Sequence, residues 1–137
     1  MKYFIAPYDD RKVHRLIDWT LSNYAKYGFG FWAIIDKVSG EFIGDCGLSM
    51  HNIDGEMLPE IGYHINKKFH NKGYASQAAR AVKEYIFKFY AYDYLYSYMN
   101  KENIASIKVA KNNGMELYKE YRDDDEDLVV YRVKRNS

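Results

Sequence analysis

The chain has 137 residues, enough for one domain with its own hydrophobic core and too few for two domains of ordinary size. Its 20 basic and 19 acidic residues give a net charge of +1, so no overall field attracts nucleic acid or an anionic membrane. The single cysteine, Cys46, excludes an internal disulfide and any zinc site that needs two cysteines. No apolar run approaches the ~20 residues of a membrane span, and the N-terminal residues do not resemble a signal peptide, so we expect a cytoplasmic protein.

The first half of the chain predicts one helix followed by three strands. Apolar residues recur at helical spacing over 10–27. Aromatic and β-branched residues dominate 31–35 and 42–50 on either side of a turn, which predicts a hairpin. A third strand is expected over 60–65, with Pro59 at its start, where a missing N–H does least harm.

The second half predicts a helix, a strand, a helix and two strands, over residues 75–90, 94–99, 103–113, 115–121 and 128–134. Asn103 is a suitable N-cap for the second of these helices, and Gly114 is a suitable left-handed terminator. This order of elements indicates an α/β (α+β) fold with a mixed, mostly antiparallel sheet. Because no linker or internal repeat interrupts the chain, we expect residues 1–137 to form a single domain.

The segment 71–76 joins a predicted strand to the N-terminus of the longest amphipathic helix. Gly73 removes a side chain where the backbone must turn, and the first amides of a helix, together with its dipole, attract anions. Ser76 can add a hydroxyl donor, so a diphosphate is a suitable ligand. The segment lacks the glycines of a Walker loop or a dinucleotide fingerprint, and an ordinary turn is the alternative interpretation.

Several stretches carry a more specific signal, and they follow one another in the order 28–34, 40–48, 60–63, 71–78 and 103–115. Together they resemble the GNAT superfamily of N-acetyltransferases, especially the branch of ribosomal-protein N-terminal (alanine) acetyltransferases. The resemblance implies a GNAT-like fold in which helices flank a sheet that is splayed between two strands. It also implies that acetyl-CoA is the co-substrate and that the acetyl acceptor is a small-molecule amine or a protein N-terminus. The resemblance places the start of the chain near the second helix of the common plan, so we expect the usual first strand to be missing.

The resemblance also assigns the residues that would bind the co-substrate. The family's pyrophosphate loop corresponds to His70, Asn71, Lys72, Gly73, Tyr74 and Ala75, followed by Ser76. His70 departs from the glutamine or arginine that the family usually has there. The strand over 60–66 would diverge from the strand over 95–99, and pantetheine would lie between them against the backbone of His64 and Ile65. Asn103 and Ser106 match positions that commonly touch the pantetheine arm.

Acetyl transfer from a thioester to an amine requires a base for the amine, a donor for the oxyanion and a proton for the departing sulfur. The resemblance suggests Glu60 as the base, and a solvent-facing glutamate is the alternative. A backbone N–H near Ile65 would hold the oxyanion. Many relatives have a tyrosine as proton donor where this chain has Ala110. Candidates for that role are therefore Tyr98, Ser106, Tyr118 or a water molecule.

Two other functions compete with this interpretation. One is a regulatory or interaction domain that binds CoA without turnover, motivated by Ala110, His70 and the short N-terminus. The other is a binder of single-stranded nucleic acid that uses tyrosine rings and lysines, although the net charge of +1 argues against it. We expect no metal site, and we expect Cys46 to be a core residue and not a nucleophile. A missing edge strand would favour a homodimer.

Overall fold

The computed structural model describes residues 2–5, 30–36 and 39–136, so the helix expected over 10–27 lies outside the described residues. The described elements, in chain order, are β1 (Lys2–Ile5), β2 (Phe31–Asp36), β3 (Phe42–Ile53), β4 (Glu56–Ile65), a short 3-10 helix (Lys67–Phe69), α2 (Tyr74–Phe89), β5 (Tyr94–Asn100), α3 (Ile104–Asn112), β6 (Glu116–Asp123) and β7 (Glu126–Lys134). Within these ranges, every element predicted from the sequence is present.

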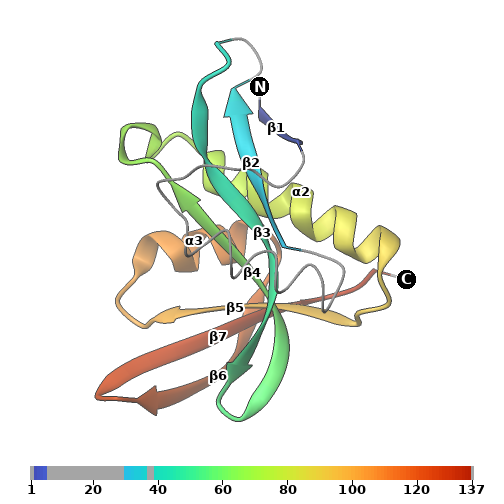
Figure 1. The fold of residues 1–137 in the computed structure, drawn as a ribbon. Helices are drawn as coiled ribbons and strands as arrows, with labels where there is room; N and C mark the ends of the chain where they lie inside the picture. Colours follow the sequence, from blue (N-terminus) through green and yellow to red (C-terminus); the bar gives the residue numbers. More distant parts are fainter. Residues whose placement is uncertain (1, 6–29, 37–38, 137) are drawn as a thin grey trace.

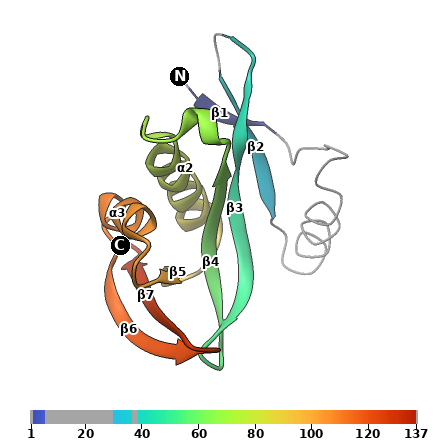
Figure 2. The same cartoon turned by 90° about the vertical axis from the view of Figure 1, so that its left-hand side faces the viewer.

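The strands form one seven-stranded sheet in the order β1-β2-β3-β4-β5-β7-β6. All neighbouring strands are antiparallel except β4 and β5, which run parallel. The predicted mixed, mostly antiparallel sheet is therefore confirmed. Figure 2 shows α2 and α3 on the same side of the sheet. Neither of these described helices has the length and apolarity needed to cross a bilayer.

The expectation that the sheet lacks its first strand is wrong. Lys2–Ile5 forms β1 and pairs antiparallel with β2, with Tyr3 opposite Ile35. Aromatic and β-branched residues favour a strand here, but four residues are too few for an alternating pattern to be recognised in the sequence. Since β1 covers the edge of β2, the argument for a homodimer from a missing edge strand no longer applies.

A two-residue turn fixes the register between β3 and β4. Asp54 and Gly55 have φ angles of 51° and 86°, as the central residues of a type I′ turn require, and Ile53 pairs with Glu56 on either side. β4 therefore begins earlier than expected, and Pro59 lies inside the strand. The antiparallel alternation turns its nitrogen away from β3, so the proline removes no hydrogen bond from that ladder.

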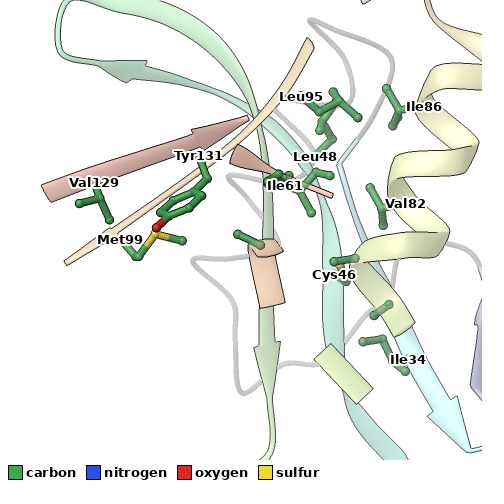
Figure 3. Close-up of a cluster of buried hydrophobic side chains, with 14 of the residues drawn as sticks. Ile34, Cys46, Leu48, Ile61, Val82, Ile86, Leu95, Met99, Val129 and Tyr131 are labelled. Carbon is green, nitrogen blue, oxygen red and sulfur yellow. The ribbon is translucent and has the colours of Figure 1, made fainter. Parts of the chain in front are cut away.

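The main core lies between α2 and the centre of the sheet. Val82 and Ile86 of α2 are at most 3% exposed and belong to the same buried cluster as Leu48 and Ile61 (Figure 3). Each such buried aliphatic side chain contributes about 1.5–3 kcal/mol relative to an exposed one. Cys46 is completely buried in this cluster, which confirms its prediction as a core residue. This packing fixes α2, and with it the loop at its N-terminus, against β3 and β4.

Candidate active site

β4 and β5 are paired at a single register position, Glu60 opposite Tyr96. One step beyond it, the Ser97 hydroxyl donates a 3.1 Å hydrogen bond to the carbonyl of Ile61. No further pairing joins these two strands within the described residues, and Figure 1 shows β4 running away from β5. The predicted splay between these strands is confirmed, and it opens a wedge in the middle of the sheet.

The register of β4 determines which backbone groups face this wedge. The amide of Asn66 donates a hydrogen bond to the carbonyl of Ile43. In an antiparallel pair, the backbone N–H and C=O groups of Asn66 and of every second residue before it therefore point toward β3. The residues between them, Tyr63 and Ile65, direct their N–H and C=O groups toward the wedge. The register therefore favours Tyr63 over His64 as the backbone partner for a ligand in the wedge.

The loop before α2 has the geometry that anion binding requires. Gly73 has a φ of 80°, a left-handed conformation that a side chain would strain. The amide of Gln77 makes the first helical hydrogen bond, 3.1 Å to the carbonyl of Gly73. The amides of Ala75 and Ser76 precede this bond and have no acceptor within the helix. They therefore combine with the positive end of the helix dipole to favour an anion.

A groove of about 650 Å³ runs from this loop to the N-terminus of α3. We call it the helix-side groove, and its lining residues are Tyr63, Ile65, Phe69, His70, Asn71, Gly73, Tyr74, Ala75, Ser76, Asn103, Ala105, Ser106, Lys108, Val109 and Asn112. Its volume is in the range of sites that bind small molecules and cofactors.

Side-chain hydrogen bonds hold the walls of this groove. The His70 ring bonds through Nε2 to the carbonyl of Ile65 at 2.8 Å and so ties the loop to the end of β4. The Asn112 amide donates to the Ser76 hydroxyl at 3.0 Å, which joins the end of α3 to the start of α2. Asn103 caps α3 by accepting from the amide of Ser106 at 3.1 Å, as predicted. Two of these bonds connect the loop to β4 and α2 to α3 around the groove, and the third caps α3.

A second hollow, of about 660 Å³, lies at the other side of the wedge. We call it the Glu60 pocket, and its lining residues are Phe31, His51, Glu60, Ile61, Gly62, Tyr63, His64, Ser97, Tyr98, Met99 and Ser106. Glu60, Gly62 and His64 follow one another along the same face of β4, because every second residue of a strand points to the same side. A Cβ at Gly62 would lie 3.1 Å from the Phe31 ring, so glycine keeps the floor of the pocket open.

Glu60 is the most perturbed acid on this face. Its side chain is only 13% exposed, and burial raises its pKa to about 8, although the backbone amide of Tyr98 favours the charged form. His51 Nε2 lies 3.5 Å from Glu60 Oε1, and burial lowers the pKa of this imidazole. Burial therefore keeps both groups largely uncharged near neutral pH. A glutamate with this pKa is suited to exchange protons with a substrate.

His64 and Tyr98 are further titratable groups in the lining of the Glu60 pocket. The His64 Nδ1 atom lies 2.8 Å from Oδ1 of the buried Asp45, and this hydrogen bond raises the pKa of His64. Burial, followed by the nearby Glu60 charge, raises the pKa of the Tyr98 hydroxyl. The ring of Tyr98 packs edge-on against His51, with ring centroids 5.9 Å apart. Strands β3, β4 and β5 thus bring five ionisable side chains to one pocket: His51, Glu60, Tyr63, His64 and Tyr98.

The structure brings together most of the site residues predicted from the sequence. The helix-side groove contains Ile65, His70, Asn71, Gly73, Tyr74, Ala75, Ser76, Asn103 and Ser106, and the Glu60 pocket contains Glu60, His64, Tyr98 and Ser106. Lys72 is exposed beside the groove and does not line it. Tyr118 lines neither hollow and packs instead against Tyr96 and Arg132.

Sequence reasoning missed His51 and Tyr63 as members of the site. The Asp54-Gly55 pair is a strong hairpin signal, and counting back from it places Ser49 opposite Glu60. His51 then follows as the diagonal neighbour of Glu60 on the adjacent strand. No comparable signal identifies Tyr63, because its role depends on where α3 packs.

The splayed sheet has free helix amides at one side of its wedge and a buried acid at the other. This arrangement is suited to group transfer from a large co-substrate. The family model for the acetyltransferase (GNAT) domain matches residues 1–116. The uncharacterised protein YkkB of Bacillus subtilis is 33% identical over 134 residues, which cover 98% of this chain and 78% of that protein.

Solved structures support the same assignment. An acetyltransferase from Agrobacterium tumefaciens superposes with a TM-score of 0.75 at 30% identity, over 93% of this chain and 74% of that one. The ribosomal L7/L12 alpha-N-protein acetyltransferase RimL, in complex with coenzyme A, has the same fold, with a TM-score of 0.73 at 16% identity, over 93% of this chain and 73% of RimL. The chain belongs to the GNAT family and is an acetyltransferase. The resemblance to the GNAT superfamily is confirmed.

Proposed function

We propose that this acetyltransferase moves the acetyl group of acetyl-CoA directly to a primary amine, carried by a small molecule or a protein N-terminus. The observation that carries the proposal is the single register position between β4 and β5. It leaves a wedge with an anion-binding helix start at one side and a buried acid at the other. The diphosphate of the co-substrate and the amine of the acceptor can therefore be held at the same time.

The loop of Asn71, Lys72, Gly73, Tyr74, Ala75 and Ser76 would receive the diphosphate on its backbone amides. Pantetheine would continue along the helix-side groove past Asn103 and Ser106, with its amides paired to backbone groups of Tyr63 and Ile65 that face the wedge. The complex of RimL with coenzyme A concerns a protein of the same fold, and it supports this choice of co-substrate.

Glu60 would act as the general base. Amines with a pKa near 10 are mostly protonated at neutral pH, so a base must remove a proton before or during attack. With a pKa of about 8, Glu60 is ionised in about a tenth of the molecules at pH 7 and in half of them at pH 8. The amine then attacks the thioester carbon, and the N–H of Ile65 or Tyr63 stabilises the oxyanion.

Direct transfer is favoured over an acetylated enzyme. Cys46 is the only cysteine of the chain, and it is completely buried in the core. Burial also raises the pKa of its thiol well above the usual range, which suppresses the nucleophilic thiolate. A sulfur that is buried and protonated cannot carry the acetyl group between the two substrates.

Two measurements on the purified protein test the proposal. Acetyl-CoA and CoA should each raise the melting temperature in a concentration-dependent way, whereas ATP at the same concentration should raise it less, because it lacks pantetheine. A panel of primary amines, including peptides with a free N-terminus, should then release free thiol from acetyl-CoA. Stabilisation without thiol release for any amine would instead support a CoA-binding regulatory domain. No stabilisation at millimolar acetyl-CoA would overturn both functions.

A further inference from the structure

Of the residues that the structure describes, only Tyr63 and Ser106 line both the helix-side groove and the Glu60 pocket. Tyr63 comes from β4 and Ser106 from the first turn of α3. The Tyr63 hydroxyl donates a hydrogen bond to Ser106 Oγ at 3.3 Å. This pair of hydroxyls therefore lies where the two hollows meet.

The reaction places the departing sulfur at the same junction. If the helix-side groove holds the co-substrate and the Glu60 pocket holds the amine, the thioester carbon must lie between them. The sulfur is bonded to that carbon and lies on its co-substrate side. Breaking the C–S bond leaves negative charge on the sulfur, and a nearby hydroxyl that can donate a proton stabilises this charge.

We propose that Tyr63 is the proton donor to the departing thiolate and that Ser106 positions and polarises it. This inference rests on the proposed acetyl transfer. When the oxyanion collapses, the C–S bond breaks and its electron pair goes to sulfur, which takes the phenolic proton of Tyr63. A hydroxyl proton can rotate, so Ser106 turns its own proton toward the phenolate oxygen. The proton that the amine gave to Glu60 returns to solvent, and Tyr63 is reprotonated from solvent, which balances the reaction to amide and thiol.

The surroundings of Tyr63 suit this role. Its ring is half-buried and packs against the main core, which holds the hydroxyl in place. Burial raises the pKa of Tyr63, so the hydroxyl retains its proton at neutral pH, and the hydrogen bond with Ser106 opposes this shift. Of the alternatives, Tyr98 lines only the Glu60 pocket, and Ala110 has no proton to donate.

The test compares two acetyl donors in Tyr63→Phe and the wild type, with any amine that the wild type acetylates. With acetyl-CoA, Tyr63→Phe should lower kcat by about 30- to 100-fold and leave the KM for acetyl-CoA within about threefold. With an aryl thioacetate, whose thiolate leaves without a proton because its thiol is much more acidic, kcat/KM should fall less than about threefold. A merely structural role would lower the rates with both donors equally.

Matched variants complete the test. Ser106→Ala should show a smaller, donor-selective loss, and Ser106→Thr should restore the rate because it retains the hydroxyl. Tyr94→Phe removes a tyrosine hydroxyl that lies outside both hollows, and it should leave both rates unchanged. Three outcomes would overturn the role of Tyr63 without touching the proposed function: equal losses with the two donors, no loss with either donor, or a donor-selective loss in Tyr98→Phe. A wild type that binds CoA but releases no thiol would overturn the proposed function as well.

Discussion

The two hollows of the wedge are built from different parts of the chain. The helix-side groove takes its anion-binding character from main-chain amides at a left-handed glycine, whereas the Glu60 pocket takes its chemistry from side chains on three adjacent strands. Main-chain amides are present whatever the neighbouring side chains are. The groove should therefore tolerate side-chain changes in the loop, such as His70 in place of the family's usual glutamine or arginine. The pKa of Glu60 depends on burial by particular neighbours, so the pocket should tolerate few changes.

The largest expected effect comes from Gly73→Asp, which adds strain, bulk and negative charge among the loop amides. We expect the Kd for acetyl-CoA to rise by at least about 100-fold, because the anion site is both blocked and repulsive. Gly55→Asp is the matched control, since Gly55 is also left-handed, at a φ of 86°, and lies in the β3–β4 turn outside both hollows. Calorimetric titration measures both variants. Unchanged affinity in Gly73→Asp would refute the groove as the diphosphate site.

Glu60→Gln tests the chemistry of the other hollow. In the wild type, kcat should rise with pH and level off above the Glu60 pKa of about 8, because only the carboxylate accepts the amine proton. Glu60→Gln should lose this limb of the pH profile and lower the plateau by about 100-fold, with the Kd for acetyl-CoA unchanged. Glu56→Gln, on the exposed start of the same strand, should keep the wild-type profile. A limb near pH 8 that survives in Glu60→Gln would exclude Glu60 as the base.

The same carboxyl should make the wild type less stable at alkaline pH. The folded protein holds the Glu60 proton more tightly than the unfolded chain does, since burial raises its pKa from 4.5 to about 8. This contribution to stability is complete below pH 4.5 and is lost as the pH rises through 8. Urea unfolding at pH 5 and pH 8.5 should therefore show a smaller alkaline loss of stability in Glu60→Gln, by about 4 kcal/mol. Parallel pH dependences in the two proteins would contradict the burial of this acid.

His70→Ala should give the smallest effect. The variant loses the hydrogen bond from the His70 ring to the carbonyl of Ile65 but keeps every loop amide. We expect the Kd for acetyl-CoA to rise by about three- to tenfold, as for the loss of one hydrogen bond of about 1 kcal/mol. His70→Gln, which keeps a donor, should lie closer to the wild type. A loss as large as that of Gly73→Asp would mean that side chains, and not amides, hold the diphosphate.

Local signals made the helix-side groove predictable from the sequence. Gly73 before a long amphipathic segment, and Asn103 and Gly114 at the two ends of α3, each act within a few residues of the chain. The Asp54-Gly55 pair carries the same kind of local signal, and it identifies both the start of β4 and the position of His51. The first strand was missed because Lys2–Ile5 is too short to show a period.

The sequence alone determined the order of the elements from β2 onward, the turn at Gly73 and the pattern of apolar residues that buries α2 against the sheet, since these depend on neighbours along the chain. The tertiary structure alone decided that β4 and β5 meet at one position, that burial raises the pKa of Glu60, and that Tyr63 meets Ser106 across 43 residues of chain. Separation of strands, desolvation and contact between distant hydroxyls result from packing, and the packing of distant segments is not encoded in any short stretch of residues.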